Sequence, residues 1–108
     1  MFSFFKKKKL HEEICEDARI ALSDGLLAQG FARNKLEAMG AGAVFSRSLK
    51  EAVSHGYKSS DAITEAKRIT SHHLAARGFD FYSVASTVDA FCVATGFESM
   101  LDLARKKS

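Results

Sequence analysis

Apolar residues recur at helical spacing in five segments of the chain, and none of these segments alternates as a strand would. The expected helices cover residues 9–29, 34–55, 60–76, 81–95 and 98–106. In the first of them, Leu10, Ile14, Ala18 and Leu22 fall on one stripe. The pattern predicts an all-α fold, a compact irregular or orthogonal bundle of four to five helices.

Four of the helical segments end in a glycine that is followed by an aromatic residue. The pairs are Gly30 with Phe31, Gly56 with Tyr57, Gly78 with Phe79 and Gly96 with Phe97. Glycine just past a helix end adopts the left-handed conformation at little cost, and the next residue can pack back on the last turn. Each pair therefore predicts a helix end with a ring folded onto that helix. Asn34, Ser59 or Ser60, and Asp80 are the expected N-caps of the helices that follow.

Two of the expected helices differ from the others in composition. The stretch EAMGAGAVF places Gly40 and Gly42 inside the second helix, where each glycine costs about 1 kcal/mol relative to alanine. Close approach of another backbone would offset that cost, either at an internal helix crossing, which we favour, or at the seam of a homodimer. The fourth helix carries Asp89 as its single charge. It is expected to be the central, most enclosed helix.

The positive charge of the chain is concentrated at its two ends. The formal net charge is +3, but seven of the sixteen basic residues lie in residues 6–9 and 105–107, which leaves nine basic against thirteen acidic residues between them. This distribution predicts a flexible aromatic and basic tail over 1–9, one helical domain over 10–104, and a basic tail over 105–108. A net negative body argues against nucleic acid as the main partner.

The first nine residues, MFSFFKKKK, have the most unusual local composition. They are Phe2, Phe4 and Phe5, followed by Lys6, Lys7, Lys8 and Lys9. Rings at the headgroup level beside lysines are typical of an interfacial membrane anchor, and the same residues suit docking to a partner. The alternative is an inert, solvated tail. Two cysteines and no secretory leader favour the cytoplasm, with attachment to the inner face of the membrane as an option.

No motif in the sequence predicts an enzyme, a metal site or a cofactor. His72 and His73 are adjacent, so on a helix they point about 100° apart and cannot bind one ion from the same face. His73 falls in an apolar stripe and is expected to be structural. No glycine-rich phosphate loop, nucleophile elbow or paired-cysteine spacing is present.

The composition is typical of a small bacterial cytoplasmic protein, and the leading hypothesis is a non-enzymatic protein-interaction module, such as an adaptor, regulator or inhibitor. Ile20 and Leu27 interrupt the polar side of the first helix and define the expected contact surface. The remaining predicted contact residues are Glu13, Asp17, Asp24 and Gly40. An acidic rim favours a basic protein partner. The alternative is a regulator that binds membranes through its tails or DNA through a helix-turn-helix around Gly56; nucleic acid is the weaker of these options because Asp61 and Glu65 would face phosphates.

Overall fold

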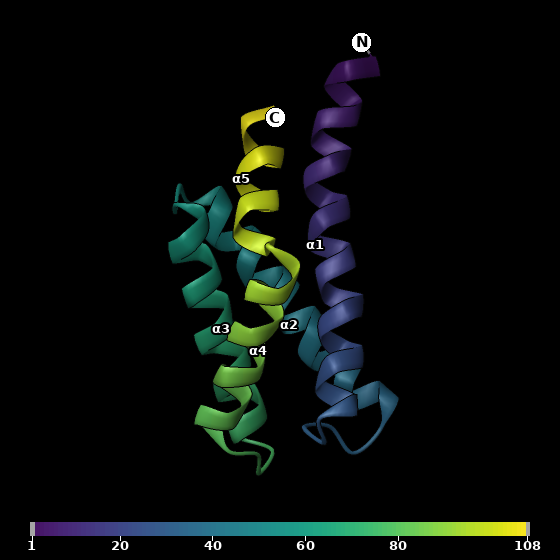
Figure 1. The fold of residues 1–108 in the computed structure, drawn as a ribbon, viewed down its shortest axis with the longest axis vertical. Coiled ribbons are helices and arrows are strands. Elements are labelled where there is room, and N and C mark those ends of the chain that lie inside the picture. Colours follow the sequence, from purple (N-terminus) through teal and green to yellow (C-terminus); the bar gives the residue numbers. More distant parts are fainter. Residues whose placement is uncertain (1, 108) are drawn as a thin grey trace.

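Five helices make up the chain, and none of the residues that the structure describes forms a strand (Figure 1). The computed structural model describes the backbone of residues 2–107 and the side chains of residues 12–106. The helices are α1 (Phe2–Ala28), α2 (Lys35–Ser54), α3 (Ser59–Ala75), α4 (Phe81–Thr95) and α5 (Phe97–Lys107). The predicted all-α bundle of four to five helices is confirmed.

A glycine with positive φ ends each of the first four helices, as the sequence predicts. The φ angles are 83° at Gly30, 87° at Gly56, 98° at Gly78 and 62° at Gly96. Three of these ends close in the same way. The Phe31 amide donates to the Leu26 carbonyl at 2.8 Å and the Gly30 amide to the Leu27 carbonyl at 3.1 Å, which is the Schellman pattern. The ends at Gly56 and Gly78 repeat both bonds.

The fourth glycine joins two helices directly. Gly96 is left-handed, and α5 begins at the next residue, with the Met100 amide donating to the Gly96 carbonyl at 3.1 Å. Helices α4 and α5 therefore form one bent element with a single hinge residue (Figure 1). Gly96 thus ends α4, and its carbonyl accepts the first hydrogen bond of α5. No loop separates the two helices, in contrast to the other three helix ends.

The rings that follow the glycines differ in burial and in their neighbours. Phe31 and Phe79 pack on the core and contact each other edge to face, with centroids 6.4 Å apart, so they join two turns. Phe97 is buried, and its ring lies 6.2 Å from those of Phe45 and Phe91. Tyr57 is the most exposed of the four rings, at 44%, so its packing on the last turn of α2 stays a prediction.

Two of the three predicted N-caps are confirmed. The Asn34 side chain accepts a hydrogen bond from the Glu37 amide at 2.8 Å, and Asp80 accepts one from the Ser83 amide at 2.9 Å. The prediction of Ser59 or Ser60 for α3 is wrong. Lys58 occupies the cap position without a side-chain bond, because Ser59 is buried and its hydroxyl accepts from Arg105 in α5 at 3.0 Å.

The core lies between α1, α2, α3 and α5, and α4 covers one side of it. Fully buried large side chains come from all five helices: Leu22 and Leu26 of α1, Phe45 and Leu49 of α2, Leu74 of α3, Val84 and Val88 of α4, and Phe97 and Leu101 of α5. The expectation that the fourth helix is the most enclosed is wrong. Only Val84 and Val88 of α4 are buried, while Tyr82 is 76% and Val93 82% exposed.

The two glycines inside α2 have different surroundings. A Cβ atom on Gly42 would overlap Ser23 Oγ and the Arg19 carbonyl of α1. The predicted internal helix crossing is therefore confirmed at Gly42, where the two backbones come together. A Cβ on Gly40 would have no atom within 4 Å, and Gly40 is exposed.

Candidate functional site

The predicted contact residues of α1 lie on its solvent-facing side. Ile20 is 48% and Leu27 37% exposed, which are high values for large apolar side chains. Glu13 and Asp24 are exposed and lie within about 40° of Ile20 around the helix axis. The opposite side of α1 carries Leu22 and packs into the core. Helical spacing therefore predicted the exposure of these residues correctly, and their role as contact residues stays a prediction.

Helix α2 presents a second group of apolar residues to solvent. Leu36 is 78% and Met39 41% exposed, Gly40 is open, and Ala43 is half-buried. Further along the same side, Arg47 and Lys50 are exposed. The sequence pattern indicated only Gly40 in this region as a contact residue. The signal for the others was the repeat of Leu36, Met39 and Ala43 opposite the buried stripe.

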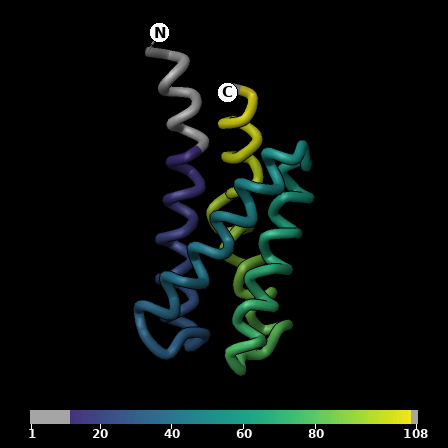
Figure 2. Tube along the Cα trace, turned by 180° about the vertical axis from the view of Figure 1, so that it is seen from behind, coloured from purple at the N-terminus to yellow at the C-terminus, as the bar shows by residue number. Residues whose placement is uncertain are grey.

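These two groups lie on the same side of α1 and α2, which are in contact and run in opposite directions, crossing at an angle and diverging away from their turn (Figure 2). The contact of Gly42 with Arg19 and Ser23 sets the level of the crossing. Counting outward at 1.5 Å per residue brings Leu27 level with Leu36, and Glu16 level with Arg47. We call this surface the α1–α2 outer face. Its members are Glu13, Glu16, Ile20, Asp24 and Leu27 of α1, and Leu36, Met39, Gly40, Ala43, Arg47 and Lys50 of α2.

The charges of the α1–α2 outer face are separated by helix. Its α1 side is acidic and its α2 side is basic. The hydrogen bond from the Arg19 guanidinium lowers the pKa of Glu16, and the positive charge of Lys50 lowers it further. Lys50 thus acts on α1 across the crossing, which agrees with the level of these residues. The result is a charged end at Glu16 and Lys50, and an end near the α1–α2 turn where Leu27, Leu36 and Met39 lie beside a single carboxylate, that of Asp24.

Asp17, which the sequence grouped with the same acidic residues, is exposed and lies at the edge of this face, about 60° from Ile20 around the helix axis. It lines a cavity of about 130 Å³ that α1 shares with the bent element α4–α5. The apolar lining includes Ile14, Ala21, Phe91 and Met100. The structure therefore brings together five of the six predicted contact residues and places Asp17 at the flank.

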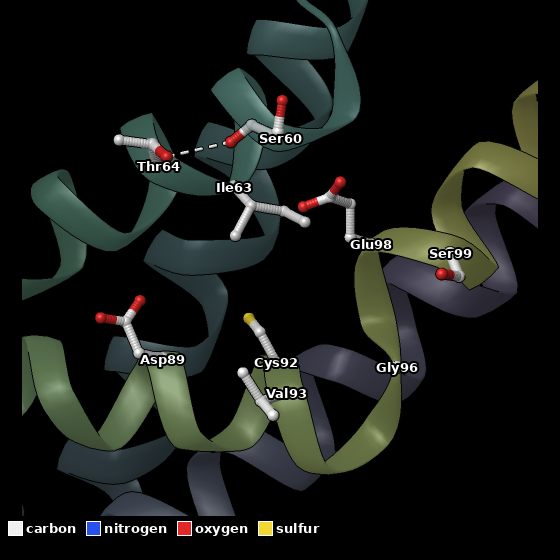
Figure 3. A pocket seen from close by; sticks show the side chains of 9 residues that line it. All are labelled: Ser60, Ile63, Thr64, Asp89, Cys92, Val93, Gly96, Glu98 and Ser99. Carbon is white, nitrogen blue, oxygen red and sulfur yellow. Dashed lines mark hydrogen bonds between the residues drawn. The ribbon is translucent and has the colours of Figure 1, made fainter.

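A larger cleft of about 640 Å³ opens between α3, α4 and α5 (Figure 3). Figure 3 shows Ile63, Cys92 and Glu98 pointing toward one another across it. Asp89 lies at one edge and forms an ion pair with Lys67 of α3 at 3.0 Å. This cleft could not be predicted from the sequence, because its residues come from three helices and have no common motif.

Cys92 is the chemically most distinctive residue of this cleft. Burial, and to a smaller extent the carboxylate of Asp89, raises the pKa of its thiol to about 11 from an ordinary value of 9.0. A thiol in this environment is protonated at neutral pH and is a poor nucleophile. Cys15 in α1 is fully buried, and burial raises its pKa as well.

The two histidines of α3 have separate environments. Burial lowers the pKa of His73, and the nearby Arg77 lowers it further. His72 is exposed, and its ring lies 4.8 Å from that of Phe81. Among the side chains of residues 12–106, no three His, Cys, Asp or Glu residues come together as a metal site.

A polar cluster that the sequence did not indicate links the two turns at one end of the bundle. Arg33 donates to Glu37 at 2.9 Å and to the Arg77 carbonyl at 2.6 Å, and its guanidinium lies 5.2 Å from the centre of the Phe79 ring. Arg77 also pairs with Glu37, at 3.4 Å. The cluster fixes the α1–α2 turn against the α3–α4 turn, and we read it as structural.

The two alternative functions depend on the aromatic and basic residues 1–9 and on the segment around Gly56. The side chains of Phe2, Phe4, Phe5, Lys6, Lys7, Lys8 and Lys9 lie outside the described residues. In the candidate helix-turn-helix around Gly56, Arg68 forms an ion pair with Glu65 and Lys67 pairs with Asp89. Within the described part of the chain, no helix has the length and hydropathy needed to cross a membrane.

Comparison with known proteins gives no relative from which a function could be carried over. No protein-family model, no curated protein and no solved structure matches the chain.

Proposed function

We propose that this chain is a non-enzymatic protein-interaction module, an adaptor, regulator or inhibitor, that binds its partner through the α1–α2 outer face. The observation that carries the proposal is the exposure of Ile20, Leu27, Leu36 and Met39 on one side of two adjacent helices. Single exposed apolar residues are common on protein surfaces. Four of them on one hairpin, flanked by charges, are typical of an interaction site.

The composition of this face supports specific binding. Covering apolar area gains about 25 cal/mol per Å² removed from water, so the four side chains supply the attraction. The carboxylates of Glu13, Glu16 and Asp24 favour a partner surface with basic residues and speed its approach. Gly40 leaves the backbone of α2 open to close contact.

The test is affinity capture from the native host, comparing the natural protein with Ile20→Ser/Leu27→Ser. The double variant should lose the captured partner and keep its melting temperature within a few degrees, because both side chains face solvent. Val93→Ser is the matched control, since Val93 is 82% exposed on α4. Equal capture by all three proteins would refute the proposal. A large fall in melting temperature for the double variant alone would assign Ile20 and Leu27 to folding instead.

A second candidate, peripheral attachment to the inner face of the membrane, draws on the composition of residues 1–9. Four lysines near an anionic surface contribute about 1 kcal/mol each, and the three phenylalanines add apolar contact. Sedimentation with anionic liposomes should then depend on residues 1–9 and weaken in high salt. Identical sedimentation of the full chain and a chain that lacks these residues would eliminate this function. On either proposal the protein works in the cytoplasm.

A further inference from the structure

The charge pattern of the α1–α2 outer face is complementary to itself. Acidic residues lie on α1 and basic residues on α2, and at the end near the turn Leu27, Leu36 and Met39 lie beside Asp24. We propose that this face binds a second copy of the chain, with α1 of each copy lying along α2 of the other. This inference rests on the proposed function and names its partner.

The register of the hairpin fixes which residues would meet. Gly42 lies level with residues 19–23, so the levels of α1 and α2 can be matched outward from the crossing. Glu13 is level with Lys50, and Glu16 is level with Arg47. In the other direction, Leu27 is level with Leu36. The effect of Lys50 on the pKa of Glu16 and of Cys15 agrees with this register, since it requires Lys50 to lie near that part of α1.

A twofold axis in the plane of the face, along the bisector of the two helices, exchanges α1 with α2 and preserves the level. It would place Glu13 of one copy opposite Lys50 of the other, and Leu27 opposite Leu36. Such a contact is isologous and closed, so it forms a dimer and does not propagate. An axis at right angles to this one would lay α1 against α1 and bring acidic residues together. The separated charges therefore favour the first arrangement over the second.

The exposed glycine of α2 fits the same contact. Gly40 disfavours a helix, yet no internal neighbour approaches it, in contrast to Gly42. Together with the half-buried Ala43 it leaves a shallow position between Leu36 and Arg47. A helix of the second copy could approach α2 closely there, as α1 of the same copy does at Gly42.

Sedimentation equilibrium on the full chain across a concentration series tests the proposal. We expect a reversible monomer–dimer equilibrium that weakens with added salt. Ile20→Ser/Leu27→Ser should raise the dissociation constant by at least about tenfold, as loss of central apolar contacts does. Val93→Ser should leave it unchanged. Circular dichroism verifies that each variant is folded.

Reversing single charges of the face, and measuring dimerisation of the variants alone and mixed, is the decisive experiment. Glu13→Lys alone and Lys50→Glu alone should each dimerise more weakly than the natural chain, because each creates two like-charge contacts per dimer. An equimolar mixture of the two variants should associate again, as a heterodimer with opposite charges at both contacts. Recovery in the mixture supports the proposed pairing; no recovery, or dimerisation of either variant at natural strength, overturns it.

Failure of this inference is distinguishable from failure of the proposed function. A chain that stays monomeric at all concentrations overturns self-association. The capture experiment with Ile20→Ser/Leu27→Ser would still show whether the same face binds a different protein.

Discussion

Helices α2 and α4 reverse the usual relation between hydropathy and burial. Helix α4 has Asp89 as its only charged residue, yet it buries only Val84 and Val88. Helix α2 carries five charged residues and has eight buried positions. It packs between α1 and α3, whereas α4 covers the outside of the core (Figure 2). The burial of α2 and α4 thus depends on how wide a stripe of residues packs and on how many helices lie around each. Average hydropathy does not determine it.

The small residues of α4 explain this difference. Its exposed positions include Ser86, Ala90 and Ala94, which bring little apolar area to a core. On α2, Phe45 and Leu49 on the buried side fill the space between neighbouring helices. A helix without charges is therefore not necessarily enclosed, and a charged helix with a continuous large apolar stripe can be central.

Truncation of one core residue in α2 and one in α4 should give the largest difference in the free energy of unfolding. Phe45→Ala removes a fully buried ring that packs on Phe97, and we expect a loss of about 3–5 kcal/mol in the free energy of unfolding. Val88→Ala on α4 removes less buried area and should cost about 1–2 kcal/mol. Urea unfolding followed by circular dichroism measures both.

Tyr82→Ala, on the exposed side of α4, is the control for this comparison and should change stability little. If Val88→Ala proved as damaging as Phe45→Ala, α4 would be a full member of the core and the comparison would fail.

The next largest effect is a stability change of opposite sign for alanine substitutions at the two glycines inside α2. Gly42→Ala forces a methyl group against the α1 backbone and should destabilise the protein by about 1–3 kcal/mol. Gly40→Ala meets no atom and should stabilise it by up to about 1 kcal/mol, because alanine favours the helix. Thermal unfolding at low protein concentration keeps self-association out of the measurement. Stabilisation by both substitutions would place the crossing of α1 and α2 elsewhere.

Local chemistry explains which features of the fold could be predicted from the sequence. A glycine after a helical stripe ends the helix through its own backbone, and Asn34 and Asp80 cap the helix that follows within four residues. Ser59 could not be predicted correctly, because Arg105, 46 residues away, engages its hydroxyl. In the same way, nothing local distinguishes Gly40 from Gly42, since the difference depends on where α1 crosses.

The candidate site was predictable to a similar extent. The exposure of Ile20 and Leu27 follows from helical spacing alone. The addition of Leu36 and Met39 required the register of the α1–α2 hairpin, and the displacement of Asp17 required the position of α4 and α5. Periodicity on one helix thus identifies exposed residues, while the composition of a surface depends on packing between helices.

The smallest effect is a difference in labelling rate between the two cysteines. These rates measure how well α1 and α4 are shielded from solvent, and no substitution is needed. Cys15 is fully buried and should react with iodoacetamide only after unfolding. Cys92 lines the cleft between α3, α4 and α5 and should react in the folded protein, but slowly. Mass spectrometry of the labelled protein at timed intervals distinguishes the two sites.

The pH dependence of Cys92 labelling shows how far α4 shields its thiol. Since the pKa is raised to about 11 in the folded protein from 9.0, the thiol holds its proton through a pH range in which an unfolded chain has lost it. The labelling rate should therefore keep rising between pH 9 and 11, whereas that of the urea-unfolded chain levels off. Asp89→Asn should shift the profile slightly toward lower pH, because burial is the larger cause and the carboxylate the smaller. A folded profile that matches the unfolded one would mean that water reaches Cys92 freely and that α4 covers the core even less than Val84 and Val88 indicate.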